Sequence, residues 1–367
     1  MTYTLLDNDF DSFFAAPFHA YGANSPYVSP LRGDLQRMLS ARNPLWAQAE
    51  HAFHTVLRDG VSVGRIVVHS HPASNTRHGT NQASFGFFDC ADDNHAAAHL
   101  LRAAETWAKA RGFDRIEGNY NLTAMQQMGV VTDGFEAAPF MDQMWNAPWT
   151  QTLLRTHGYA ARFPMTTFHL DPRALDAERL APQALRDQLA NQGVTFEPVT
   201  RRNLDACLEH SRHVLNTSFL DNPMFVPPTR EEYAFQAEGM RWILDPRLSS
   251  VALCKGDPVG AIVVVPDANP LLRATGSRIG WRTPYHLLRH KLTNTRAVVV
   301  FQGVVPAFQR MGLNPAMLAR SCTAAAKAGY TEVGGTWIAD SNTASLRQVE
   351  KVGGQPLHRL HLFGKDL

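Results

Sequence analysis

The sequence predicts an α/β protein made of two tandem domains, each a mixed β-sheet flanked by helices. Three observations lead to this fold class. An apolar strand in the C-terminal half runs through a glycine-containing loop directly into a helix. The same succession of elements occurs in the N-terminal half. Finally, a chain of 367 residues with 44% hydrophobic content is long for one domain and sufficient for two.

The strand–loop–helix junction lies between residues 297 and 318. Its strand, Ala297–Phe301, continues past the polar Gln302 to the apolar Val304 and Val305 and ends at Pro306. The loop Gln309–Asn314 then leads into a helix, whose first turn offers backbone N–H groups without partners. Together with the helix dipole, these groups form an anion site. Gly312 lets the backbone approach a phosphate without a clash at Cβ, and Arg310 adds a charge-assisted contact.

A second informative segment follows that helix. A turn at Ala328–Tyr330 precedes an expected strand around Gly334–Ile338. Asn342 is then a good N-cap for another helix, because its side chain can accept a backbone N–H bond. Gly353 suits the end of that helix, and the last strand is expected over Pro356–Phe363.

Both segments resemble the GNAT superfamily of acyl-CoA-dependent acyltransferases. The pyrophosphate loop of that superfamily reads Gln/Arg-x-x-Gly-x-Gly/Ala; Gln309 and Gly312 fit it, whereas Asn314 departs from it. Further on, the superfamily carries an Asn, a small residue three positions later, and Glu-Lys before a glycine. Asn342, Ser345 and residues 350–354 fit this pattern. The alternative is an unrelated α/β unit with a tight turn.

The resemblance implies that acyl-CoA is the co-substrate, and the pattern of cysteines and histidines leads us to expect no metal. It also implies that the Asn342 amide bonds the pantetheine arm. The expected acyl-CoA-binding residues are Gly303, Val304, Val305, Gln309, Arg310, Met311, Gly312, Leu313, Asn314, Asn342 and Ser345.

The two halves are related by a diverged repeat. Sliding the chain by 217 residues sets Gly86 on Gly303 and Leu101 on Leu318. Asp59-Gly60 in one half and a Gly-Asp-Pro sequence in the other are turn signals between β-branched runs, which predicts a hairpin in each. The first half is expected to continue with strand Ala83–Phe88, helix Ala96–Arg111 and strand Asp114–Gly118.

The expected domains are residues 1–170 and 193–367, joined by a charged helical linker over 171–192. Under the same slide, the loop Gln309–Asn314 falls on Asp92–Ala97, which has two carboxylates and no glycine. Carboxylates repel a pyrophosphate. The first domain is therefore expected to be a degenerate copy that does not bind coenzyme A and instead shapes the acceptor cleft.

Over nearly its whole length the chain resembles a group of bacterial tandem GNAT-like proteins. The residues that carry this likeness include Phe85–Asp89, Gly118–Asn121 and Asp133–Glu136. The group contains the bacterial ceramide synthases, which transfer a fatty acyl group from acyl-CoA to a sphingoid base. The resemblance thus implies an N-acyltransferase acting on a primary amine, with long acyl chains and lipid-like amines among the candidate substrates.

In such a transfer a neutral amine attacks the thioester carbonyl, so a base must first take a proton from the ammonium. A backbone N–H near Gly303–Val305 would stabilise the oxyanion. The tyrosine that many GNAT enzymes place seven residues after the Asn is Val349 here, and strand 297–305 has no carboxylate. The remaining acid–base candidates are Asp340, His361 and Glu136; catalysis by positioning alone is the other option.

Composition narrows the partners and the compartment. A net charge of +2 without a basic run argues against a nucleic-acid binder. Four separated cysteines indicate neither a zinc site nor a disulfide framework, and the N-terminus has no signal-peptide pattern, so a cytoplasmic protein is expected. The apolar stretch Phe135–Trp149 either packs between domains or forms a lid that touches an acyl chain or the inner membrane face.

Two alternative functions stay open. One is a non-catalytic acyl-CoA-binding protein, which the missing tyrosine and carboxylate would explain. The other is an aminoacyl-tRNA-dependent transferase of tandem GNAT fold, against which the near-neutral charge and the intact Gln309–Gly312 pattern argue. Acyl length, acceptor and oligomeric state do not follow from the fold class.

Overall fold

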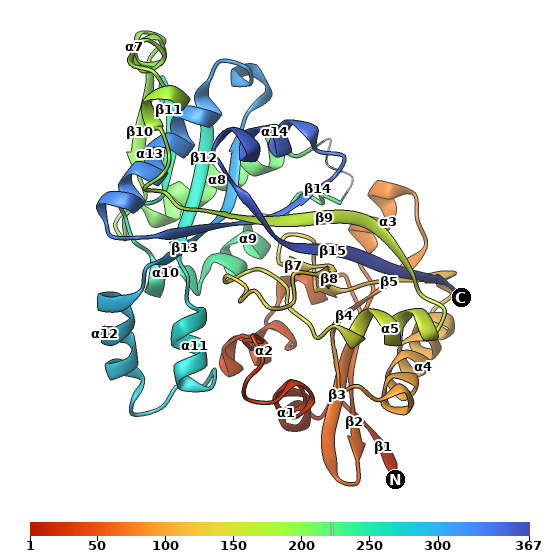
Figure 1. Cartoon of the computed structure of the whole chain (residues 1–367). Helices are drawn as coiled ribbons and strands as arrows, with labels where there is room; N and C mark the ends of the chain where they lie inside the picture. The colour runs from red at the N-terminus through yellow and green to blue at the C-terminus, as the bar shows by residue number, and fades with distance from the viewer. Residues whose placement is uncertain (221, 223) are drawn as a thin grey trace. The chain divides into compact units, whose positions relative to one another are not determined.

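The computed structural model describes residues 1–220, 222 and 224–367 (Figure 1). The chain divides into two compact units. The first comprises Met1–Thr166, Leu272–Gly280 and Leu357–Leu367; the second comprises Thr167–Leu271 and Trp281–Pro356. Each contains parallel and antiparallel strand pairs with helices packed on them, so the expected α/β class with mixed sheets is confirmed.

The sheet of the first unit is mostly antiparallel. Its strand order is β1 (Tyr3–Asp7), β2 (His51–Arg58), β3 (Val61–His69), β4 (Gln82–Cys90), β5 (Arg115–Gly118) and β15 (Gln355–Asp366), with β8 (Val130–Asp133) also pairing with β15. Only β4 and β5 run parallel in this series. The helix α4 (Asn94–Ala110) connects them, as a parallel pair requires.

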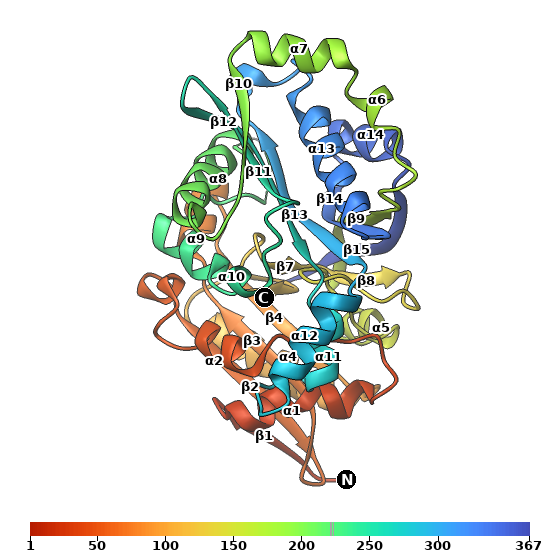
Figure 2. The same cartoon turned by 90° about the vertical axis from the view of Figure 1, so that its left-hand side faces the viewer.

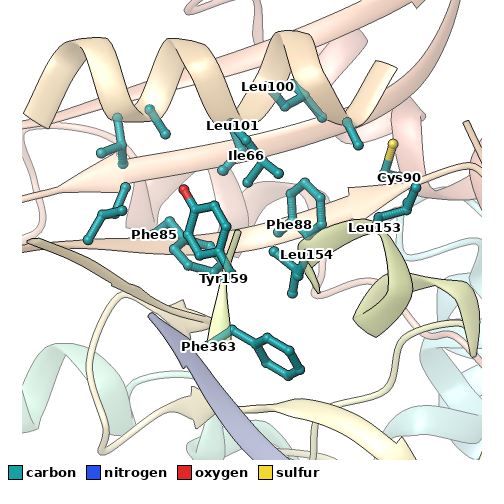
Figure 3. Packing of buried hydrophobic residues seen from close by; sticks show 14 of the residues in the cluster. Ile66, Phe85, Phe88, Cys90, Leu100, Leu101, Leu153, Leu154, Tyr159 and Phe363 are labelled. Carbon is teal, nitrogen blue, oxygen red and sulfur yellow. The ribbon is translucent and has the colours of Figure 1, made fainter. Parts of the chain in front are cut away.

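Two apolar layers cover this sheet, because successive strand residues point to opposite faces. On one face, Ile66 and Phe85 pack against Leu100 and Leu101 of α4 (Figure 3). On the other, Val67 packs with Phe13 of α1 (Phe10–Tyr21). The remaining elements of the unit are α2 (Arg32–Met38), η1 (Pro44–Ala47), α3 (Pro72–His78), the ribbon β6–β7 (Tyr120–Asn121 and Gln127–Met128) and α5 (Trp149–Thr156).

The second unit repeats this plan. Its strand order is β9 (Ala160–Leu170, of which Thr167–Leu170 belong to this unit), β14 (Glu332–Ala339), β13 (Arg296–Val304), β12 (Asp257–Pro266), β11 (Ser250–Cys254) and β10 (Val194–Pro198). Here β13 and β14 form the parallel pair, connected by α13 (Leu313–Lys327). A Cβ on Gly260 would meet Met317 of α13, and one on Gly303 would meet Ser218 of α8 (Leu204–Ser218), so these two helices cover opposite faces.

Further helices of the second unit are α6 (Ala177–Leu180), α7 (Gln183–Asn191), α9 (Arg230–Ala237), α10 (Met240–Ile243), α12 (Thr283–Thr293), η2 (Pro306–Phe308) and α14 (Thr343–Lys351), and α11 (Asn269–Thr275) begins in it. Residues 171–192, expected to be a linker, lie inside this unit, where Ala181 and Leu189 are buried in its core. In the described part of the chain, no helix is long and apolar enough to cross a bilayer.

Both expected hairpins are confirmed. Asp59 and Gly60 have φ of 50° and 84°, and Lys255 and Gly256 have φ of 54° and 93°. A two-residue turn with positive φ at both residues has the same twist as the two strands that it joins. Glycine is favoured in such turns because it adopts positive φ without a clash at Cβ. The turn of the second hairpin thus lies at Lys255-Gly256, with Asp257 already paired to Cys254.

Candidate functional site

The parallel strands of the second unit separate part-way along their length. Pairing runs from Arg296 with Glu332 to Val299 with Gly335 and then ends. At that point β13 carries a bulge at Val300, because the register with β12 shifts between Val263 and Val264. A bulge bends its strand and increases the twist. The distal half of β13 therefore stays paired with β12 alone and leaves an open edge.

The open edge directs one N–H of the expected oxyanion residues into the gap. The Val305 N–H donates to the Val259 carbonyl over 3.0 Å and is therefore occupied. In an antiparallel ladder, inward and outward backbone groups alternate. The N–H of Gly303 then also faces β12, whereas that of Val304 faces away from it. Val304 is thus the residue of the three that offers a backbone donor at the opening.

The loop that follows ends in an uncapped helix. Gly312 is the N-cap of α13, has φ of 81°, and, as a glycine, makes no side-chain capping bond to this helix end. The Gln309 side chain folds back and donates to the Val304 carbonyl over 3.1 Å. Arg310 is exposed at the loop surface. The first turn of α13 therefore keeps free N–H donors beside an exposed cation, which suits an anion.

A second reason for glycine at position 312, besides the expected approach of a phosphate, lies in the packing around it. A Cβ at this position would lie 2.6 Å from Cδ1 of Leu185 in α7, and the positive φ disfavours any other residue. Glycine is thus favoured here by the positive φ, and it leaves room for the Leu185 side chain.

Asn314, which departs from the superfamily pattern, joins a chain of amides across the opening. The Gln302 side chain on β13 donates to the Asn314 side chain over 2.6 Å and to its carbonyl over 2.9 Å. Asn314 in turn donates to Gln348 of α14 over 2.5 Å. Neither Gln302, the polar residue of this strand, nor Gln348 was expected from the sequence to take part in the site.

Asn342 caps α14 as expected. Its Oδ1 accepts the Ser345 N–H over 3.1 Å, so this pair fixes the start of the helix. Asn342 is exposed and Ser345 is half-buried. The Ser345 N–H is occupied by the cap, which leaves the hydroxyl of Ser345 and the amide nitrogen of Asn342 as the groups to be considered for a ligand.

In the first unit the corresponding opening is filled by the chain. Pairing of β4 and β5 ends at Phe85 with Gly118. Beyond it, the Phe87 N–H donates to Asn121 over 2.7 Å and the Phe88 N–H donates to Asn119 over 3.2 Å. A Cβ on Gly86 would lie 1.6 Å from the Tyr120 carbonyl. Residues 119–121 thus occupy the strand edge that β13 leaves open.

The helix end of the first unit is also occupied. The Asp93 carboxylate accepts the N–H groups of His95 and Ala96 over 3.0 and 3.1 Å, and it pairs with Arg58 at 2.8 Å. Burial by itself raises the Asp93 pKa, but the bonds from Ala96, Tyr3 and Arg58 outweigh it and leave the pKa lowered. Asp93 therefore takes the place that an external anion would take at α4.

Comparison with known proteins gives full-length relatives. Protein YghO of Escherichia coli (strain K12) is 26% identical over 371 aligned positions, covering 99% of this chain and 94% of that protein. The bacterial ceramide synthase of Caulobacter vibrioides is 24% identical over 364 positions, covering 97% and 94%. No family model matches the chain.

Solved structures show the same architecture over the whole chain. A tandem GNAT protein from the clavulanic acid biosynthesis pathway superposes with a TM-score of 0.61 at 13% identity, covering 100% of this chain and 98% of its own. The chain has the tandem GNAT fold. A GCN5-related N-acetyltransferase from Sphaerobacter thermophilus gives a TM-score of 0.54 at 15% identity, with coverages of 99% and 95%. At these identities the likeness concerns the fold.

The acid–base candidates of this tandem GNAT chain fall in both units. Asp340 is exposed at the end of β14, directly before α14, in the unit with the open strand edge. His361 lies on β15 in the first unit, with its Nδ1 2.9 Å from the Thr132 hydroxyl. Glu136 is exposed in the loop after β8 of the first unit. Their catalytic roles remain predictions.

The stretch Phe135–Trp149, expected either as a lid or as packing, is largely buried. Phe140, Met144 and Trp145 are among the buried apolar residues. The Trp145 indole donates to the Phe135 carbonyl over 2.9 Å, which closes the loop on itself. Phe140, Met144 and Trp145 are therefore used for packing, whereas Phe135, Met141 and Trp149 are half-buried.

Proposed function

We propose that the second unit binds acyl-CoA and that the protein transfers the acyl group to a primary amine. The observation that carries this proposal is the contrast between two copies of one fold. In the second unit the edge of β13 is open and α13 is uncapped. In the first unit, Asn119, Asn121 and Asp93 fill the equivalent edge and helix end. One acyl-CoA per chain follows.

In the proposed complex, the pyrophosphate lies at the first turn of α13. The N–H groups from Met311 to Asn314 and the Arg310 guanidinium are the donors, because they are the free positive groups at this end. The pantetheine arm runs along the open edge of β13, and the Asn342 amide is a further donor to it. The Val304 N–H then bonds the thioester carbonyl and the oxyanion formed from it.

The chemistry is a direct acyl transfer. The amine nitrogen attacks the carbonyl carbon, the new C–N bond forms, and the C–S bond breaks to release the coenzyme A thiolate. One proton leaves the nitrogen for a base or for water. Asp340 is the candidate base within the second unit. Positioning of the two substrates accounts for the rate if water takes the proton.

The acceptor that we propose is a lipid-like amine such as a sphingoid base, with a long-chain acyl group as donor. The support is the full-length similarity to a protein named bacterial ceramide synthase. In this proposal the first unit binds no acyl-CoA and instead helps to bind the acceptor amine. The site of action is the cytoplasm, at or near the membrane where such an amine resides.

Calorimetric titration of the full chain with coenzyme A, acetyl-CoA and palmitoyl-CoA tests the first step. We expect one site per chain, with palmitoyl-CoA bound more tightly than acetyl-CoA. Two sites would contradict the contrast between the units, and no binding would reject the acyl-CoA proposal. Release of free thiol from palmitoyl-CoA in the presence of a sphingoid base then tests the reaction.

A non-catalytic acyl-CoA-binding protein is the second candidate. The observation in its favour is that Val349 stands where many GNAT enzymes have a tyrosine, and it is packed, because a Cβ on Gly354 would lie 2.4 Å from it. Tight palmitoyl-CoA binding without thiol release for any amine would favour this candidate. Acyl transfer that is lost on ribonuclease treatment would point instead to an aminoacyl-tRNA-dependent transferase.

A further inference from the structure

Helix α12 (Thr283–Thr293) presents an apolar stripe to solvent. It lies in the segment between β12 and β13, next to α11 in the chain (Figures 1 and 2). Trp281, Tyr285, Leu288 and Leu292 are 85%, 63%, 59% and 77% exposed. A helix turns by about 100° per residue, so Tyr285, Leu288 and Leu292 lie within about 60° of one another, and Trp281 directly precedes the N-cap Arg282. We call these four residues the α12 stripe.

The orientation of the helix is fixed by its other face. His290 is buried, and Thr283 and Leu287 are half-buried. Burial lowers the pKa of His290, so a neutral imidazole lies against the protein. Thr283, Leu287 and His290 thus form the face of α12 that packs against the protein, and the stripe lies on the opposite face, which is exposed to solvent. An amphipathic helix normally buries its apolar residues, whereas α12 leaves its largest ones outside.

Cations flank the stripe. Arg282, Arg289 and Lys291 are exposed, and the Arg282 guanidinium lies 4.6 Å from the centre of the Trp281 ring. From residue 268 to residue 331 the chain contains no Asp or Glu, although the whole chain carries a net charge of only +2. Basic charge is thus concentrated in the region that carries the stripe.

An exposed apolar stripe flanked by cations indicates which kind of partner α12 binds. Two copies of α12 meeting face to face would bring like charges together, which opposes a symmetric dimer. Trp and Tyr with flanking Lys and Arg are the residues that favour the interface of a bilayer with anionic lipids. The helix has only 11 residues, so it can lie in the interface but cannot span it.

We propose that α12 docks the protein on an anionic lipid surface, with the α12 stripe in the interfacial layer and Arg282, Arg289 and Lys291 at the head groups. This inference does not depend on the acyl-transfer chemistry. The shallow open depression lined by Trp281, Arg282, Tyr285 and His286 is then covered by lipid.

Sedimentation of the full chain with vesicles tests the proposal, without acyl-CoA present. We expect binding to vesicles of phosphatidylcholine mixed with phosphatidylglycerol, weaker binding to phosphatidylcholine alone, and weakening by salt. Replacing all three cations with Gln should lower the partition coefficient on the order of a hundredfold, since each contributes about fivefold. The double variant Trp281→Ser and Leu288→Ser should lower it by at least tenfold.

A matched control is available on another helix. Trp242 of α10 is 74% exposed and does not belong to the stripe, so Trp242→Ser should leave vesicle binding unchanged. Urea unfolding of each variant, compared with that of the parent protein, reports whether the second unit is folded. Equal binding of parent and α12 variants to anionic vesicles would overturn the proposal. So would a protein that ignores vesicles but forms a dimer that Leu288→Ser dissociates.

The two proposals can fail separately. Vesicle binding is measured without a thioester, and acyl transfer can be measured with a water-soluble short amine in the absence of lipid. Vesicle binding without thiol release would support the docking role of α12 and reject the proposed acyl transfer. Acyl transfer in solution without vesicle binding would support the transfer and reject the docking role.

Discussion

Replacing Gly312 with glutamate should remove coenzyme A binding while leaving the protein folded. The new carboxylate would stand at the N-terminus of α13, where the proposed pyrophosphate lies. At about 5 Å from a phosphate charge and an effective dielectric constant of about 20, the repulsion is about 3 kcal/mol. That free energy corresponds to an affinity lower by about two hundredfold at 25 °C.

The stability cost of this variant has two parts. A residue other than glycine at φ of 81° costs roughly 1–2 kcal/mol in the left-handed region. The added Cβ would also lie 2.6 Å from Leu185, but the atom it meets is the end of a flexible side chain that can rotate away. We therefore expect a small loss of unfolding free energy beside the large loss of affinity.

Gly256→Glu is the matched control. Gly256 has φ of 93°, lies in the β11–β12 turn of the same unit, and has open space where a Cβ would be. Both variants carry the same backbone penalty and the same added charge. Calorimetry should show coenzyme A binding by the Gly256 variant only, with similar urea midpoints for both. Unchanged affinity in the Gly312 variant would refute the placement of the pyrophosphate.

Three further perturbations test the fold and the site. Asp89→Ala leaves the buried guanidinium of Arg65 without its carboxylate, 2.7 Å away, and should cost about 3–5 kcal/mol in urea unfolding; a cost no larger than that of the exposed Asp171→Ala would contradict this. Burial lowers the pKa of His69 to about 3, so only the unfolded state gains this proton as pH falls from about 6.5 towards 3. The unfolding free energy should drop by up to about 1.4 kcal/mol per pH unit in that window, and a slope unchanged by His69→Gln would reject it. Asn342→Ala should cost about 1 kcal/mol through the lost cap and weaken acyl-CoA binding; unaltered affinity would leave Asn342 a purely structural cap.

Elements whose causes are local could be predicted from the sequence. Asp59-Gly60 and Gly256 form the expected hairpin turns, and Asn342 caps the expected helix. The pattern around Gly312 led to the GNAT fold, although the glycine also makes room for Leu185, more than a hundred residues earlier in the chain. These features depend on a few neighbouring residues, which a sequence shows directly.

The alignment of the two halves by one fixed offset is accurate for some strands and wrong for others. The offset of 217 holds for β5 and β14, since Arg115 and Glu332 are the corresponding strand starts. For β4 and β13 the offset is 214, because Gln82 of β4 pairs with Arg115 and Arg296 of β13 pairs with Glu332. The match of Gly86 with Gly303 is therefore not a structural equivalence. The connection between strand and helix differs in length, which a single slide cannot represent.

The sequence by itself determined the fold class, the hairpins and the lack of the tyrosine and carboxylate that many GNAT enzymes carry. That the loop before α13 binds a phosphate stays a prediction. Only the tertiary structure decided which strand edge is open. Asn119 and Asn121 fill the edge of β4, and Asp93 caps α4 with the help of Arg58, through contacts between residues far apart in the sequence. It also decided that the apolar residues of α12 face outward, because the face of a helix that is buried depends on what packs against it.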